Sequence, residues 1–240
     1  MKITRFKQSC FRIEHPTNDG NKMPVYIDPF RLPRGEVPAD IVLVSHLHFD
    51  HFNKKSIKRL WKTTTNICGA ASARKIKKAF PASHGLAPGD SITIHGIDVR
   101  AVPAYNRSKF FHKRDKAWVG YLIDIGGKTL YHIGDTDFIP EMRDLQEKDI
   151  EVAFMPFRGT FNMDPIEAIE AIKAIIPRTV VPMQGARKNV KKFKHHAMDR
   201  LGGVQVLCLE PGDTMHLAPA NINRNSGEGI LQDPPGYQPR

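Results

Sequence analysis

The chain has 240 residues, and its 36 Lys and Arg against 25 Asp and Glu give a formal net charge of +11. Its 40% hydrophobic and 25% charged residues are typical of a globular protein and exclude wholesale disorder. The longest apolar runs, such as residues 41–44, are far shorter than the roughly 20 residues of a membrane-spanning helix. We therefore expect a globular protein without a membrane span, long enough to bury a core without disulfides.

The cysteines and the N-terminal residues indicate a cytoplasmic protein. Cys10, Cys68 and Cys208 are odd in number and widely spaced, which is typical of reduced thiols and not of a disulfide framework. Residues 1–15 carry a basic side chain every few positions and no apolar stretch, so we expect no secretory signal. We predict that each cysteine fills a place in the apolar core.

The apolar pattern predicts strands in the early part of the chain and alternating strands and helices later. Residues 18–21 (Asn-Asp-Gly-Asn) and the Gly-Gly pair at 126–127 are typical hairpin turns. A helix after the strand at 40–45 should place Ile57, Leu60 and Trp61 on one side. The expected strands cover residues 3–13, 24–28, 40–45, 92–94, 99–102, 119–125, 128–133, 152–155, 179–183 and 204–209, and the other expected helices cover about 72–80 and 165–176.

The clearest helix start lies at residues 164–167. Asp164 is a capping residue, Pro165 suits the first helical turn, and Glu167 stands three residues after the cap. This helix should carry Ile166, Ile169, Ile172 and Ile176 and stop before Pro177.

These elements predict a layered α/β domain with helices outside packed sheets. The domain should span residues 1–217. Residues 218–240 are rich in Asn, Gly and Pro and poor in large apolar side chains, so we expect a polar tail there.

The sharpest chemical signal follows the strand at 40–45, where residues 45–51 read Ser-His-Leu-His-Phe-Asp-His. Three imidazoles and one carboxylate within six residues suit zinc, iron and related divalent metals. His46 and His48 alternate, so both project to the same side of an extended segment. A turn then lets Asp50 and His51 face a neighbouring point. The alternative is a solvated polar loop, which the preceding apolar strand disfavours because α/β sites are built at strand ends.

This motif resembles that of the metallo-β-lactamase-fold hydrolases, whose four-layer αββα sandwich carries one or two metals at the sheet edge. Residues 26–29 (Tyr-Ile-Asp-Pro) resemble the second hairpin strand of that family. Residues 131–136 (Tyr-His-Ile-Gly-Asp-Thr) resemble a strand end whose aspartate, here Asp135, often bridges two metals. The resemblance therefore implies an α/β fold of this type.

Two further segments resemble one branch of the family, which contains ascorbate-phosphate lactonase-like proteins and many uncharacterised members. They are residues 156–163 (Pro-Phe-Arg-Gly-Thr-Phe-Asn-Met) and the turn at 209–213 (Leu-Glu-Pro-Gly-Asp). The resemblance covers roughly residues 1–217, and none of its motifs specifies a substrate.

Two positions depart from the family pattern. The third histidine normally follows the strand that here ends near residue 105, and this chain has Asn106 there. Asn is a weak zinc ligand but can hold a metal-bound water or a substrate oxygen. His112, in the same loop, is the candidate replacement as ligand or catalytic acid, and an ordinary exposed histidine is the alternative. The last histidine of the family is replaced by Gln184, a poor ligand for such a metal. We therefore expect one metal to bind tightly and a second weakly or not at all.

The other candidates have plainer alternatives. Asp137 either orients a ligand or forms a turn, and His132 is predicted to be packed and hydrogen-bonded and not a ligand. Arg158 follows the strand at 152–155, where it either contacts an anion or lies on the surface. The histidines expected to be structural or solvated are His15, His84, His95, His195, His196 and His216.

Many basic residues fall into three groups, each after a strand end that we expect to point at the site. The groups are Lys54, Lys55, Lys58, Arg59 and Lys62, then Arg107, Lys109, Lys113, Arg114 and Lys116, then Arg187, Lys188, Lys191, Lys192 and Lys194. Each is either a solvated face or part of a positive rim that concentrates an anionic substrate such as a phosphate ester, a nucleotide or a nucleic-acid strand. Within the second group, Phe110 and Phe111 either pack on a ring of the substrate or act as a lid. No motif of a dedicated nucleic-acid-binding module is present.

We therefore predict a metal-dependent hydrolase that cleaves an ester, lactone or phosphodiester bond of a small anionic, phosphate-bearing substrate. The expected cofactor is a divalent metal, zinc in the first place and manganese or iron otherwise, which lowers the pKa of a bound water. The predicted metal ligands are His46, His48, Asp50, His51, His112 and Asp135. The predicted catalytic residues are Asp50, His112 and Asp135, and the predicted substrate-binding residues are Asn106, Arg158 and Gln184.

A rival interpretation is a catalytically degenerate protein of the same fold that binds a nucleotide or RNA through the basic rim. A nucleic-acid substrate is not favoured, because no large insertion offers a separate RNA-clamping domain. The sequence leaves the oligomeric state open.

Overall fold

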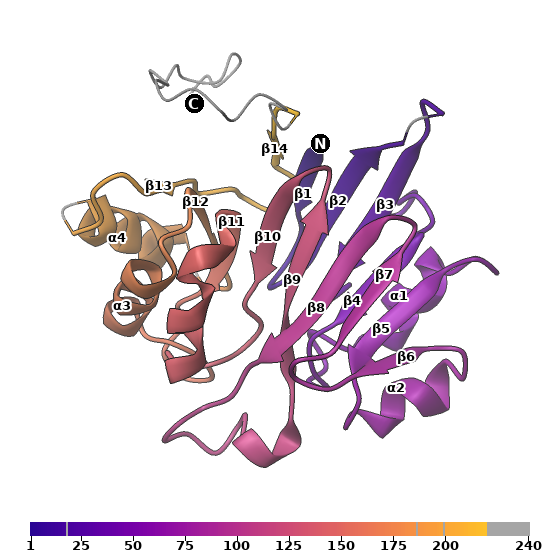
Figure 1. Ribbon diagram of the computed structural model, residues 1–240, viewed down its shortest axis with the longest axis horizontal. Coiled ribbons are helices and arrows are strands. Elements are labelled where there is room, and N and C mark those ends of the chain that lie inside the picture. Colours follow the sequence, from indigo (N-terminus) through magenta and orange to yellow (C-terminus); the bar gives the residue numbers. More distant parts are fainter. Residues whose placement is uncertain (18, 186, 199, 220–240) are drawn as a thin grey trace.

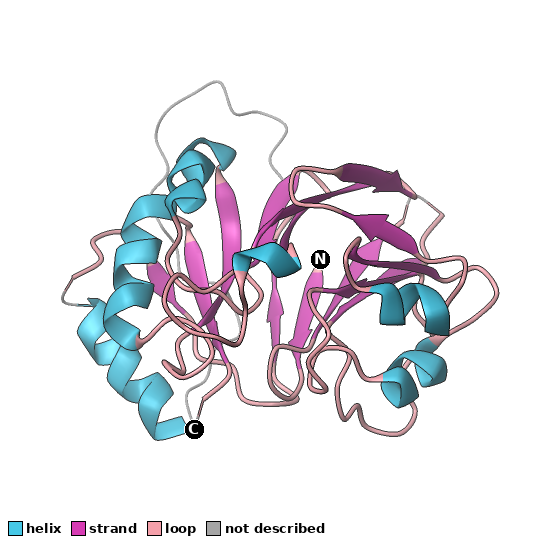
Figure 2. Cartoon of the chain, turned by 90° about the horizontal axis from the view of Figure 1, so that it is seen from below, coloured by secondary structure: helices cyan, strands magenta, loops and turns pink. Residues whose placement is uncertain are grey.

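The computed structural model describes residues 1–17, 19–185, 187–198 and 200–219. Most of the predicted tail and Asn18 of the first hairpin turn therefore lie outside the described residues. Two sheets pack face to face, and helices cover the outer surface of each one (Figure 2). The predicted four-layer αββα sandwich is confirmed. Among the described residues, no helix is long and apolar enough to cross a bilayer.

The first sheet has the strand order β14-β1-β2-β3-β4-β5-β6 (Figure 1). Its strands are β1 (Lys2–Arg5), β2 (Phe11–Pro16), β3 (Lys22–Ile27), β4 (Ile41–Val44), β5 (Asn66–Ala70), β6 (His84–Leu86) and β14 (Thr214–His216). The pairs from β3 to β6 are parallel, so the carboxyl ends of β3 and β4 meet at one edge. The short helices α1 (Lys54–Leu60) and α2 (Arg74–Ala79) connect these strands on the outer face.

The second sheet has the strand order β13-β12-β11-β10-β9-β8-β7. Its strands are β7 (Ser91–Ile94), β8 (Ile97–Pro103), β9 (Val119–Ile125), β10 (Lys128–His132), β11 (Ile150–Pro156), β12 (Thr179–Met183) and β13 (Gln205–Val206). Its helices are η1 (Arg114–Lys116), η2 (Pro140–Lys148), α3 (Pro165–Ile175) and α4 (Arg187–Met198). Strands β10 to β13 run parallel, so β10 and β12 also end at a common edge.

Apolar side chains form two cores. One lies between the sheets and contains Phe11 and Phe154, whose ring centroids are 4.2 Å apart. The other lies between the second sheet and its helices and contains Ile169, Ile172 and Ile175 of α3. Strands β4 and β12 are buried along their whole length, because both faces of each sheet are covered.

The helix start at Asp164 is confirmed, because its carboxylate accepts hydrogen bonds from the backbone N–H groups of Ile166 and Glu167 at 2.8 and 2.9 Å. Of the four isoleucines expected in this helix, Ile169 and Ile172 are buried. Ile176 ends the helix in a left-handed conformation at φ 50° and Ile166 lies in the first turn, so both side chains are exposed and Ile175 is buried in their place.

Other local predictions need correction. Trp61 does not share the buried side of Ile57 and Leu60, because α1 ends at Leu60 and the indole is 51% exposed. The strand expected at 204–209 pairs only at Gln205 and Val206. Helix α4 occupies a basic run that suggested no helix. Its signal was the buried series Val190, Phe193 and Ala197 at helical spacing.

Candidate metal centre

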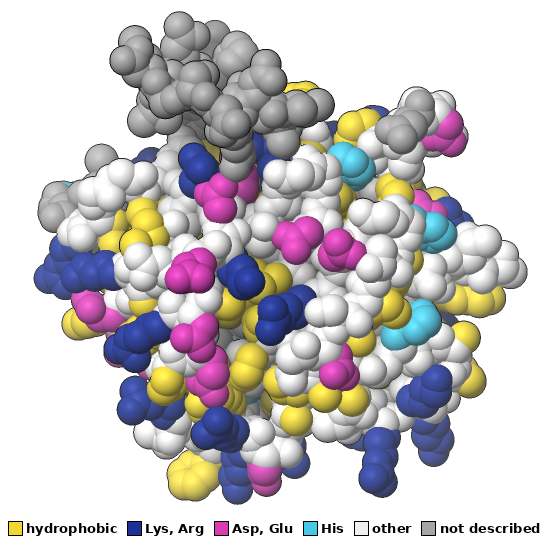
Figure 3. Space-filling view, in the orientation of Figure 1, with side chains coloured by type: hydrophobic (Ala, Val, Ile, Leu, Met, Phe, Trp, Pro, Cys, Tyr) yellow, Lys and Arg dark blue, Asp and Glu magenta, His cyan; other side chains and the backbone are white. Residues whose placement is uncertain are grey.

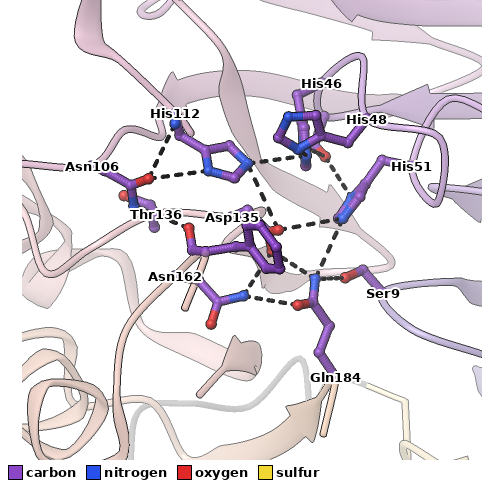
Figure 4. A network of polar contacts seen from close by, with 12 residues as sticks. Ser9, His46, His48, His51, Asn106, His112, Asp135, Thr136, Asn162 and Gln184 are labelled. Atoms are coloured by element: carbon purple, nitrogen blue, oxygen red, sulfur yellow. Dashed lines mark hydrogen bonds and ion pairs between the residues drawn. The ribbon is translucent and has the colours of Figure 1, made fainter. Parts of the chain in front are cut away.

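The candidate metal centre lies at the edge where β3, β4, β10 and β12 end. His46 follows β4, Asp135 follows β10, and Gln184 follows β12, while His112 comes from the loop after β8 (Figure 4). Gly134 has φ 72° and makes the turn that brings Asp135 inward, and a Cβ there would lie 3.1 Å from the carbonyl oxygen of Val119. The carbonyl ends of parallel strands thus gather residues that are far apart in the sequence.

Three imidazoles converge on one point. The Nε2 atom of His46 lies 3.1 Å from Nδ1 of His48 and 3.2 Å from Nε2 of His112. The three form a group that can hold a metal ion, and Figure 4 shows their rings turned toward one another. Three histidines with an open fourth position are a typical ligand set of catalytic zinc.

The protonation states of this group suit a cation. Burial lowers the pKa of His46 well below its usual value, and burial also lowers the pKa of the half-buried His48. Burial lowers the pKa of His112 to about 4. All three rings are therefore neutral at physiological pH and offer nitrogen lone pairs, so these residues fit a divalent metal.

A second group of potential ligands consists of His46, His51 and Asp135. The Oδ2 atom of Asp135 lies 3.6 Å from Nε2 of His51 and 3.7 Å from Nε2 of His112, between the two groups. Burial alone would lower the pKa of His51, but the carboxylates of Asp28 and Asp135 outweigh it and raise that pKa well above its usual value. Burial opposes ionisation of Asp135, yet the charge of His51 keeps the pKa of Asp135 below its usual value. Without a cation, His51 supplies the positive charge between two carboxylates.

Asp28 orients the histidine loop and was missed as a site residue by sequence reasoning. Its carboxylate accepts hydrogen bonds from Nδ1 of His51 at 2.6 Å, from the backbone N–H of Ser45 at 2.8 Å and from Oγ of Ser45 at 2.7 Å. All three residues are fully buried. The bond to Nδ1 directs Nε2 of His51 toward the site, as a carboxylate partner does for a metal-binding histidine. The available signal was a polar residue at the end of an apolar strand, in the Tyr-Ile-Asp-Pro segment.

Asn106 positions His112. Its Oδ1 atom lies 3.2 Å from Nδ1 of His112 and accepts a hydrogen bond from the backbone N–H of His112 at 3.1 Å. Its amide nitrogen donates to Asp137 at 2.9 Å and to the carbonyl oxygen of Phe161 at 3.1 Å. Lys109 also pairs with Asp137. Donation from Nδ1 to Asn106 leaves the Nε2 lone pair of His112 facing His46. Asp137 thus holds Asn106, which in turn orients His112. This contact corresponds to the first of its two predicted roles, that of orienting a ligand.

Gln184 points into the site, as the sequence predicted, but it presents its amide nitrogen. That nitrogen donates to Oδ1 of Asp135 and to Oγ of Ser9, both at 2.6 Å, and lies 3.4 Å from Nε2 of His51. Its oxygen accepts from Nδ2 of Asn162 at 2.8 Å, and Asn162 also donates to Oδ1 of Asp135 at 3.1 Å. Gln184 and Asn162 therefore fix Asp135 so that its Oδ2 atom faces the histidines.

The remaining predicted residues lie at different places. Asp50 is half-buried and falls outside both groups of converging ligands among the described residues, although its carboxylate opposes the lowering of the pKa of His48. Arg158 is exposed, with its guanidinium 6.0 Å from the ring centroid of Phe161. Their roles stay predictions. An exposed position for His112 is wrong, since this side chain is fully buried. His132 is packed as predicted, with Nε2 2.9 Å from the carbonyl oxygen of Ser9.

The three basic groups do not share one location. The first belongs to α1, whose C-terminal end lies beside Ala39, before β4 begins. The second lies in the loop of His112, where Phe111 packs edge-on against Phe161 at 4.5 Å. The third is on α4, where several of the side chains lie outside the described ones. The structure therefore places the second group in the loop that carries His112 to the candidate metal centre.

An αββα sandwich with a histidine loop at the edge where the strands end defines a metal-binding protein of the metallo-β-lactamase fold. The sequence profile of the Beta-lactamase superfamily domain matches residues 2–184. The chain therefore belongs to the beta-lactamase superfamily.

Relatives named UPF0173 metal-dependent hydrolase resemble nearly the whole chain. The one from Methanoculleus marisnigri is 31% identical over 91% of this chain and 98% of its own length. The one from Nanoarchaeum equitans is 32% identical over 90% of this chain and 100% of its own length.

Two solved structures show the same fold. Igni18, a metallo hydrolase from Ignicoccus hospitalis, has a TM-score of 0.73 at 25% identity and covers 90% of this chain and 99% of its own. CmlA, a diiron β-hydroxylase from Streptomyces venezuelae, has a TM-score of 0.71 at 14% identity over 90% of this chain and 54% of its own. The second likeness concerns the fold alone.

We expect His112→Ala to weaken metal binding by more than the roughly 10- to 100-fold typical of removing an orienting partner. The reason is the loss of one of three converging nitrogens. Metal titration of the metal-free protein with a competing chelator measures the affinity. His84→Ala, outside both ligand groups, is the matched control. Equal affinities in the two variants would remove His112 from the ligand set.

We expect Gln184→His to raise the tightly bound metal from near one toward two per chain. An imidazole would add a nitrogen ligand beside His51 and Asp135, where the amide nitrogen of Gln184 can only donate. Elemental analysis after gel filtration gives the count, and Gln184→Leu removes the amide without adding a ligand. Two tightly bound metals in the unsubstituted protein would contradict the prediction.

Proposed function

We propose that this chain is a metal-dependent hydrolase acting on an ester, lactone or phosphodiester bond of a small anionic, phosphate-bearing substrate. The observation that carries the proposal is the convergence of three neutral imidazoles, two of them buried, beside an ionised carboxylate. His48 is half-buried, so this side of the group is open to solvent. The names of the relatives from Methanoculleus marisnigri and Nanoarchaeum equitans support the same class of reaction.

The residues of the centre have different proposed roles. His46, His48 and His112 would hold the first metal, and His51 with Asp135 would hold a second, weaker one. A bound divalent metal, zinc in our proposal, lowers the pKa of a coordinated water and polarises the substrate oxygen. Asn162 and Gln184 occupy Oδ1 of Asp135, so Oδ2 is left to face the metal side and to accept a hydrogen bond that orients the attacking water. Asp50 would orient that water from the side of His48.

The surroundings of the centre support an anionic substrate with an apolar part. Arg107, Lys113 and Arg158 are exposed in the two loops that carry His112 and Asn162. Phe111 and Phe161, in the same two loops, pack against each other and offer an apolar surface, with Arg158 over the ring of Phe161. We propose that the cations attract the charged group while the rings contact the rest of the substrate. The free cysteines of the chain are consistent with the cytoplasmic location that we propose for it.

The first test removes the metal ligands. We expect the double substitution His46→Ala and His48→Ala to abolish metal retention and hydrolysis of chromogenic phosphodiesters and lactones while the circular dichroism spectrum stays the same. The double variant, the unsubstituted protein and the His84→Ala control are assayed with added zinc, manganese and iron. Hydrolysis that persists in the double variant would refute the proposal.

The second test concerns the charge of the substrate. Hydrolysis of an anionic ester should slow as salt rises, since exposed charges are screened over about 8 Å at physiological ionic strength. A neutral ester of the same alcohol should be insensitive. Arg158→Gln should raise KM for the anionic ester only, whereas Lys148→Gln, on η2, should change neither. The same salt dependence for both esters would exclude an anion-attracting role.

A further inference from the structure

The net positive charge of the protein is concentrated in one segment. Residues 51–89 contain nine of the 36 Lys and Arg and none of the 25 Asp and Glu, so they carry nine of the eleven net charges. Eight of the nine side chains are exposed. Dark blue side chains project at the lower right of Figure 3, where Figure 1 places α2. The nine are Lys54, Lys55, Lys58, Arg59, Lys62, Arg74, Lys75, Lys77 and Lys78.

This arrangement does not serve the stability of the helices. Like charges stand four residues apart at Lys54 and Lys58 and at Arg74 and Lys78, a spacing that destabilises a helix. Neither α1 nor α2 has an acidic residue in its first turn, and the cations there oppose the helix dipole. Only the cations of the last turns complement it. A surface that keeps such repulsion points to an anionic partner.

Few of these cations are neutralised within the protein. Lys62 pairs with Asp40 at 2.6 Å, and Arg59 donates to the carbonyl oxygens of Leu32 and Pro33. Among the residues that the structure describes, the members that take part in no ion pair include Lys54, Lys55, Lys58, Arg74, Lys75 and Lys78. Six cations on two neighbouring helices suit a partner with several regularly spaced negative charges better than one with a single anionic group.

An apolar groove of about 420 Å³ lies between the C-terminal ends of α1 and α2. Trp61, Ile67, Phe80 and Pro81 line it, and Lys58 stands at its rim. Its volume falls within the roughly 300–1,000 Å³ of sites that take small organic groups. The exposed Trp61, which the sequence pattern placed on one side of a helix with Ile57 and Leu60, thus forms a wall of this groove.

The groove and the candidate metal centre lie at opposite ends of the first sheet. Ile67 of β5 pairs with Val42 near the start of β4, whereas His46 follows the end of β4. The carbonyl oxygen of Leu60, next to Trp61, accepts a hydrogen bond from the backbone N–H of Ala39, just before β4. The groove is therefore a separate site, and it needs no part of the proposed hydrolysis.

We propose that this surface binds single-stranded nucleic acid. One base occupies the groove and stacks on Trp61 or Phe80, while the neighbouring phosphates contact the lysines of α1 and α2. A basic surface interleaved with aromatic rings is the combination that binds single strands without sequence preference. An anionic lipid surface is less suited, because membrane-binding helices bury protruding apolar side chains and here the apolar surface is a hollow.

The affinity for a fluorescently labelled short oligothymidylate, measured by anisotropy, tests the charges. We expect the pair Lys75→Glu and Lys78→Glu to weaken binding by roughly tenfold or more and to reduce the slope of log affinity against log salt. The pair Lys22→Glu and Lys148→Glu changes the net charge equally at exposed positions elsewhere and should have little effect. Equal weakening by both pairs would overturn the proposal in favour of nonspecific attraction.

Stacking of a base on Trp61 is tested separately. Trp61→Ala should weaken oligothymidylate binding by about fivefold or more, while Trp61→Phe should retain most of it, since stacking needs a ring. Binding should quench the fluorescence of Trp61 and leave that of the buried Trp118 unchanged. Heparin, a polyanion without bases, should bind the wild type and Trp61→Ala equally.

Two outcomes would overturn the assignment of a nucleic-acid base to the groove. If Trp61→Ala leaves the affinity for oligothymidylate unchanged, no base is bound in the groove. Binding of phosphatidylserine vesicles that depends on Trp61 and Lys75, without oligothymidylate binding, would assign the surface to a membrane. Hydrolysis should be the same in all these variants, so failure here is distinguishable from failure of the proposed function.

Discussion

The geometry of the candidate metal centre depends on one buried carboxylate. Asp28 directly follows β3 and accepts hydrogen bonds from Ser45, which directly follows β4, and from Nδ1 of His51. These bonds tie the histidine loop to the neighbouring strand and direct the other nitrogen of His51 toward Asp135. A buried carboxylate is costly unless such donors surround it, so the loop and the strand end stabilise each other. The convergence of His46 and His48 with His112 is built on that fixed loop.

The two departures from the family pattern have a common explanation in hydrogen bonding. Asn106 stands where a histidine is usual, and its amide oxygen orients His112. His112, six residues further along the loop, thereby supplies the third imidazole of the group. Gln184 stands at the other unusual position, and its amide nitrogen binds Asp135. The first departure keeps three imidazoles together, whereas the second replaces a ligand with a donor. The chain therefore preserves one ligand group more fully than the other.

The sequence predicted the layers and the histidine loop because both depend on local patterns. Apolar strands such as β4, and the capped start at Asp164, determine their own structure from neighbouring residues. Trp61 was misplaced because helical spacing does not show where a helix ends, and a residue just past the end leaves the buried side. Ser9 and Asn162 were missed at the site for another reason. Ser9 reaches it through Gln184, 175 residues further along the chain, and Asn162 reaches it through Asp135 and Gln184, 27 and 22 residues away. A polar residue carries no sequence signal of such a partner in another segment.

The two ends of the first sheet differ in the charge of the side chains around them. At the edge where β4 ends, burial keeps His46, His48 and His112 neutral, and a cation bound there would meet the ionised carboxylate of Asp135. At the opposite end, an apolar groove with Lys58 at its rim lies between the C-terminal ends of α1 and α2, the two helices that carry most of the other cations of residues 51–89. Were those cations grouped at the metal edge instead, their repulsion would oppose metal binding by the neutral histidines. The same sheet can therefore carry a cation site and an anion-binding surface because its length keeps their fields apart and solvent ions screen what remains.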